Sequence, residues 1–196
     1  MKVKYNAPTV LTFAFISAFV LILSQTALHS LTEQWFLVPG KSKFSPTNVR
    51  NIVTLFTRVL GHANWPHLVS NFSFILLIGP ILEETYGSLS LLIMICITAL
   101  VTGILNVIFF TSGLLGASGV VFMMILLASF TNFNKGEVPL TFILVLILYL
   151  GRELFSTFGA GNSAAAAGPG NISQFAHIVG GFIGSLFGFF RKNPSA

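Results

Sequence analysis

Residues 89–111 read LSLLIMICITALVTGILNVIFFT and carry no charged side chain. A helix that crosses the hydrocarbon core of a bilayer needs about 20 predominantly apolar residues. This stretch is long enough for one crossing, and further apolar runs lie before and after it. The sequence therefore predicts an all-α membrane protein.

The composition of the whole chain agrees with a membrane location. Of its 196 residues, 54% are hydrophobic and 8% are charged, and the mean hydropathy is +0.88. A soluble domain usually carries about 25% charged residues. No polar stretch is long enough to form a second domain, so we interpret residues 1–196 as a single membrane domain.

The chain is basic, with a formal net charge of +5. In a soluble protein this charge would suggest a nucleic-acid partner. Here the basic residues lie in loops and at the ends of apolar runs, as do Lys2, Lys4, Arg191 and Lys192. Contact with anionic lipid headgroups explains this distribution more simply. We therefore expect membrane lipids, and no nucleic acid, as partners.

Six apolar runs are candidates for transmembrane helices. They cover approximately residues 8–28, 67–85, 89–111, 115–130, 138–157 and 173–190. The segment 30–64 between the first two runs is more polar and contains an amphipathic stretch, 49–60. Aromatic residues beside Lys and Arg are typical of the membrane interface, so we expect this segment to lie at the surface.

Six spans place both termini on one side of the membrane. The basic residues divide evenly between the two sides, so the orientation rests on Lys2 and Lys4, which flank the first span. Basic residues at the first span usually mark the cytoplasmic side. We therefore expect cytoplasmic termini, in a bacterial inner membrane.

Two patterns predict structural roles. Gly180, Gly184 and Gly188 recur every four residues in the last span, a spacing typical of close helix packing in membranes. This packing would bring the sixth span against the fourth. Glu83, at the inner end of the second span, is expected to cap backbone groups of a loop.

Four polar residues occur on spans that run in the same direction. His67 and Asn71 lie near the start of the second span, Ser118 near the start of the fourth and His177 near the start of the sixth. At about 1.5 Å per residue, each lies one or two turns below the outer surface. The spans thus place all four at a similar depth.

These residue types fit nucleophilic catalysis. A serine hydroxyl becomes a strong nucleophile when an adjacent base takes its proton, and His177 is the candidate base. An oxyanion needs donors, and Asn71 and His67, four residues apart, share one helix face. The backbone N–H of Ser118, at a helix start, is a third candidate donor. The chain contains no Asp, so we predict a Ser118–His177 dyad rather than a triad.

Taken together, these motifs resemble those of the rhomboid intramembrane serine proteases. Gly116-Ala117-Ser118-Gly119 is similar to the GxSG motif of that family. The spacing His62-x4-His67-x3-Asn71 is similar to its second span, and Ala176-His177-x2-Gly180-x3-Gly184 to its sixth. The resemblance covers about residues 57–191.

The resemblance implies a six-helix rhomboid-like bundle that cuts single-span membrane proteins near their outer membrane boundary. It implies a dyad of Ser118 and His177, oxyanion donors from His67, Asn71 and the Ser118 N–H, and no metal or cofactor. It implies supporting roles for Gly116, Phe122 and His62. It also implies a half-submerged first loop, 30–64, and a loop at 159–171 that caps the site.

The chain departs from the family pattern at three places. Phe122 stands where relatives often carry Tyr, and Arg58 where some carry a further His. Gln174 and Phe175 precede Ala176 where small residues are common. None of these changes removes a reacting group. The alternative functions are a catalytically inactive rhomboid-like binder or chaperone, and a transporter or proton channel. The channel is disfavoured because the polar residues cluster at the outer side and do not line a path across the membrane.

Overall fold

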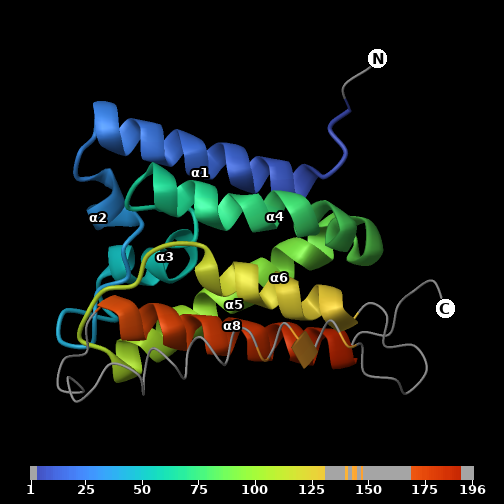
Figure 1. Cartoon of the computed structure of the whole chain (residues 1–196). Helices are drawn as coiled ribbons and strands as arrows, with labels where there is room; N and C mark the ends of the chain where they lie inside the picture. The colour runs from blue at the N-terminus through green and yellow to red at the C-terminus, as the bar shows by residue number, and fades with distance from the viewer. Residues whose placement is uncertain (1–3, 131–139, 141–142, 145–146, 148–168, 191–196) are drawn as a thin grey trace.

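The computed structural model describes residues 4–130, 140, 143–144, 147 and 169–190. All regular secondary structure within these ranges is helical (Figure 1). The helices are α1 (Pro8–Thr26), α2 (Leu31–Trp35), α3 (Val49–Thr57), α4 (Trp65–Tyr86), α5 (Ser88–Phe109), α6 (Ser118–Phe130) and α8 (Pro169–Phe190). The prediction of an all-α protein is confirmed for this part of the chain.

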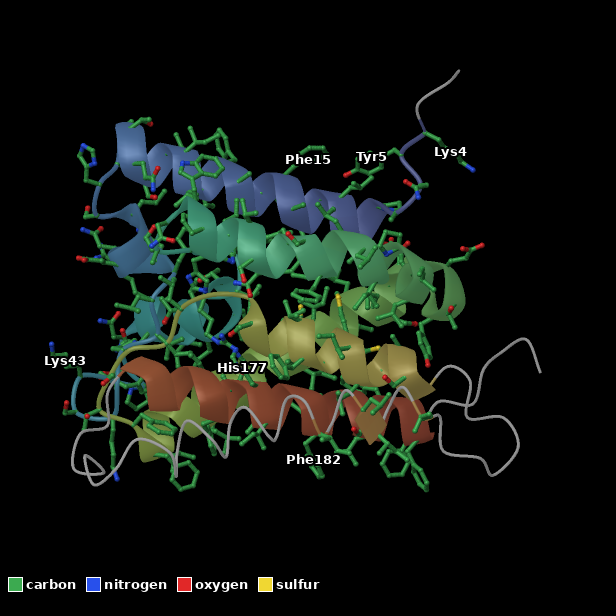
Figure 2. All side chains as sticks on the ribbon, viewed as in Figure 1. Lys4, Tyr5, Phe15, Lys43, His177 and Phe182 are labelled. Carbon is green, nitrogen blue, oxygen red and sulfur yellow. The ribbon has the colours of Figure 1, made fainter. Side chains whose placement is uncertain are left out.

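Three of the described helices, α1, α4 and α5, are long and apolar enough to cross a membrane. Shorter apolar helices cover Ser118–Ser129 and Phe175–Phe190. Large apolar side chains point outward from the bundle, among them Phe15 on α1 and Phe182 on α8, each 63% exposed (Figure 2). The predicted fifth span, 138–157, lies mostly outside the described residues, so the count of six spans stays a prediction.

Two helices begin three or four residues from the approximate starts that the sequence predicts for their spans. The fourth span was expected to begin at residue 115, but α6 begins at Ser118, because Gly116 has a φ of +105°, outside the helical region. The sixth span was expected from residue 173, after a loop at 159–171. Instead α8 begins at Pro169, and proline is favoured in the first turn of a helix. The rest of that loop, 159–168, lies outside the described residues.

The helices α4, α6 and α8 run in the same direction, and α5 runs opposite to them (Figure 1). The first turns of the three parallel helices therefore lie at one end of the bundle, as the alternation of spans predicted. Lys43 of the first loop lies at this end and Lys4 at the other (Figure 2).

Close contact between α6 and α8 depends on glycine. A β-carbon on Gly180 would overlap the backbone carbonyl of Gly119, and one on Gly184 would overlap that of Met123. Only hydrogen at these two positions allows the backbones to approach so closely. The predicted packing of the sixth span against the fourth is confirmed here.

The segment between α1 and α4 packs against the turn that leads into α6. Val38 and Leu114 exchange backbone hydrogen bonds of 3.0 and 2.9 Å in an isolated β-bridge. The N–H of Lys41 donates to the carbonyl of Phe110 at 2.7 Å. The helices α2 and α3 thus lie at the end of the bundle where α4, α6 and α8 begin (Figure 1).

The carboxylate of Glu83 connects α4 to α1. It accepts hydrogen bonds from the N–H of Thr9 at 2.8 Å and of Val10 at 3.0 Å. Val10 also packs against Gly79 on the same face of α4. The expectation that Glu83 caps backbone groups is confirmed, but these groups belong to the first turn of α1 and not to a loop. Helix N-termini carry unsatisfied N–H groups and attract negative charge, and the acceptor here serves the first turn of α1.

Candidate active site

Ser118 is the first residue of α6 and follows a tight turn. Gly116, in that turn, takes the positive φ that favours glycine, and Ala117 accepts the first helical hydrogen bond from Val121 at 3.0 Å. The first N–H groups of a helix have no partner within the helix. The partly buried Ser118 is thus placed beside backbone donors at the positive end of the helix dipole.

His177 lies on α8 where it meets α6 (Figure 2). Its imidazole stacks on the ring of Phe122, with centroids 4.2 Å apart and planes within 5°. The backbone carbonyl of Ala176 lies 3.2 Å from where a β-carbon of Gly119 would be. The residue before His177 is therefore packed against the residue after Ser118. The predicted stacking role of Phe122 is present without the hydroxyl that tyrosine would add.

His67 and Asn71 approach the same turn from α4. A β-carbon on Gly116 would lie 2.6 Å from Cε1 and 2.7 Å from Nε2 of His67, and 3.8 Å from Nδ2 of Asn71. Asn71 is buried, and its Nδ2 has no hydrogen-bond partner among the described residues. Two side-chain donors thus converge beside the backbone that precedes Ser118.

The start of α4 fixes the position of His67. Asn64 is the N-cap residue, and its Oδ1 accepts the backbone N–H of His67 at 2.9 Å. Such a cap satisfies a donor that the helix itself leaves free. The imidazole of His67 then lies edge-on to that of His62, with centroids 5.1 Å apart.

His62 contacts His67 from the interior of the bundle. It is 1% exposed, and its ring also contacts Phe72 at 5.7 Å. Burial, together with the nearby His67, lowers the pKa of His62 to about 4, so the ring is neutral at neutral pH. Its Nδ1 lies 3.3 Å from the carbonyl of Leu60, and its Nε2 has no partner among the described residues.

The buried His62 predicts a loss of stability in acid. Its pKa is about 6.5 in the unfolded chain and about 4 in the folded one, so the unfolded state binds more protons between these values. The free energy of unfolding is therefore unaffected by the titration of His62 above pH 6.5. It falls as the pH drops toward 4, by at most about 3 kcal/mol. Thermal unfolding in detergent at a series of pH values measures this loss.

His62→Leu is the matched variant, because it removes the titrating group and keeps an apolar side chain beside Phe72. His67 titrates in both proteins, so the difference between them isolates His62. The unfolding midpoint of the His62→Leu variant is expected to fall less between pH 7 and 4 than that of the wild type. Equal falls in the two proteins would contradict the prediction.

Sequence reasoning noted Arg58 only as a departure from a pattern, but the structure places it in the site. Arg58 is 1% exposed, and its side chain donates to the carbonyls of Gly116 at 3.1 Å and Ala99 at 3.4 Å, and to Oγ1 of Thr102. The sequence feature that could have indicated a buried role is a lone positively charged residue followed by the apolar pair Val59-Leu60. The hydrogen-bond partners of Arg58, Thr102 among them, could not be identified from that feature.

A comparison with protein-family models matches residues 49–193 to the Rhomboid domain. The match includes α3, α4, α5, α6 and α8, and with them every predicted site residue. No curated protein matches the chain.

Proposed function

The chain belongs to the rhomboid family, whose members are generally intramembrane serine proteases, and from this premise we propose that it cuts membrane proteins with a Ser118–His177 dyad. The observation that supports the proposal is the packing of α8, which bears His177, on α6, which bears Ser118. The Phe122 ring holds the imidazole of His177 at 4.2 Å, and Ala176 contacts Gly119. The family membership also makes the chain an integral membrane protein.

In the proposed reaction, His177 takes the proton of the Ser118 hydroxyl while Oγ attacks the carbonyl carbon of the scissile bond. A tetrahedral intermediate forms, with its negative charge on the former carbonyl oxygen. His177 then gives the proton to the leaving amine, and the C–N bond breaks. Water, activated in the same way, hydrolyses the acyl-enzyme and restores Ser118.

The oxyanion would receive hydrogen bonds from Asn71 Nδ2, the His67 ring and the Ser118 N–H. The unpartnered Nδ2 of Asn71 supports this role. Leaving a buried donor unsatisfied costs about 1–3 kcal/mol, and such a donor is expected where a reacting group will supply the acceptor. Donors already in position need little reorganisation during the reaction.

We further propose that the end of the bundle bearing Ser118 faces the outside and that both termini are cytoplasmic, with six spans in a bacterial inner membrane. A single-span substrate would enter between helices and unwind near its outer boundary, because the peptide bonds of an intact helix are shielded. Trp35, Val49, Ile52 and Phe56, which are exposed on α2 and α3, would then contact the outer leaflet.

Active-site labelling tests the proposal against its alternative, a catalytically inactive binder of membrane proteins. A fluorophosphonate probe reacts only with an activated serine, so we expect it to modify Ser118 of the purified protein. Mass spectrometry of the labelled peptide identifies the residue.

Two variants control the labelling experiment. Ser118→Ala is expected to lose the label. Ser129→Ala is expected to keep it, because the Ser129 hydroxyl donates to the carbonyl of Ile125 farther along α6. An unlabelled wild type that still co-purifies with membrane proteins would reject the protease and favour the binder.

A further inference from the structure

Arg58 is a buried cation in the segment between α3 and α4. It is 1% exposed, and within the described part of the chain its side chain donates to two backbone carbonyls and to the hydroxyl of Thr102. Removing a charge from water is unfavourable by several kcal/mol unless good hydrogen bonds replace the lost hydration. Burial lowers the pKa of Arg58 to about 9, so it stays charged at neutral pH.

Arg58 forms hydrogen bonds with both the N–H and the carbonyl of Gly116. The carbonyl of Arg58 accepts the N–H of Gly116 at 3.0 Å, and its Nη1 donates to the carbonyl of Gly116 at 3.1 Å. The same guanidinium is fixed on α5 through Ala99 and Thr102. One residue therefore ties the turn before α6 to both α3 and α5.

The turn at Gly116 needs hydrogen bonds from other segments to keep its position in the site. Gly116 has a φ of +105°, and it lies against His67 and Asn71. If its carbonyl were released from Arg58, the donors of His67 and Asn71 would lie close by. An internal hydrogen bond to the Gly116 carbonyl would then compete with the reaction's oxyanion for these donors.

We propose that Arg58 is a positioning residue for the oxyanion site: it holds the Gly116 carbonyl so that His67, Asn71 and the Ser118 N–H are left for the reaction intermediate. The proposal rests on the proposed protease function. The fixed positive charge lies next to the turn, so it also favours the negative charge that develops there.

Arg58→Met tests this role, because methionine removes the charge and the donors and keeps an apolar stem. The phosphonyl oxygen of a fluorophosphonate occupies the oxyanion site during labelling. We expect the rate constant for labelling, and kcat for a single-span substrate, to fall by about 10- to 100-fold. KM should stay within about twofold, and the final amount of label per protein should be unchanged.

Arg50→Met is the matched control. Arg50 is an exposed cation on α3 that lies over the Trp35 ring at 5.2 Å. Its replacement removes the same charge without touching the turn, so labelling and kcat should match the wild type. Equal rate constants in the wild type and Arg58→Met would overturn the proposal. So would a lower final amount of label with an unchanged rate constant, which indicates misfolding alone.

Arg58→Lys keeps the test decisive if Arg58→Met does not fold. Lysine retains the charge but cannot reach three acceptors at once, so we expect about a tenfold fall in kcat with KM unchanged. A wild-type kcat in Arg58→Lys would overturn the proposal. Failure of the wild type to label at Ser118 would instead reject the protease function itself.

Discussion

Alanine in place of Ser118 or His177 is expected to lower the cleavage rate of a reconstituted single-span substrate by about 10⁴-fold or more. Members of a catalytic unit show losses of this size because neither works without the other. For the same reason, the double variant should be no slower than either single variant. Single-turnover cleavage in proteoliposomes, followed on gels, measures all three rates.

The control for this experiment is Ser185→Ala. Ser185 lies on α8, as His177 does, and its hydroxyl donates within the helix to the carbonyl of Gly181 at 3.0 Å. Its replacement should leave the cleavage rate within about twofold of the wild type. Wild-type cleavage by His177→Ala would mean that another group takes the proton, and the dyad would be rejected.

The common depth of the candidate site residues followed from the sequence because it depends on properties of single segments. Apolar length identifies a helix, and alternation fixes its direction. The positions of His67, Asn71, Ser118 and His177 along their helices then give a common depth. Glycine spacing in the last span identified the face that packs on α6, and the structure confirms this contact at Gly180.

The contacts that the sequence did not predict join segments far apart in the chain. Glu83 accepts its hydrogen bonds from residues more than 70 positions earlier, and Arg58 reaches α5 and the turn at Gly116. Which hydrogen-bond partner a buried charge finds depends on how the helices pack, and hydropathy carries no such information. Hydropathy placed the start of the fourth span near residue 115, whereas the positive φ of Gly116 delays the start of α6 to Ser118.

Alanine is expected to have opposite effects at two neighbouring positions of α8, Gly180 and Gly181. A β-carbon on Gly180 would overlap the backbone of Gly119, which cannot move without displacing α6. Gly180→Ala should therefore push His177 away from Ser118. A displacement of about 1 Å in a catalytic group lowers the rate about 10²-fold, and forcing an extra carbon into a packed core costs about 1–3 kcal/mol.

Gly181→Ala is the matched control, since its β-carbon would meet only the side chain of Leu126, at an ordinary 3.4 Å. Alanine is also preferred over glycine within a helix, by roughly 0.5–1 kcal/mol. The unfolding temperature should thus fall for Gly180→Ala and rise slightly for Gly181→Ala, while the cleavage rate falls, by about 10²-fold, only in the former. If both variants kept wild-type cleavage, close packing of α8 on α6 could not be what brings His177 to Ser118.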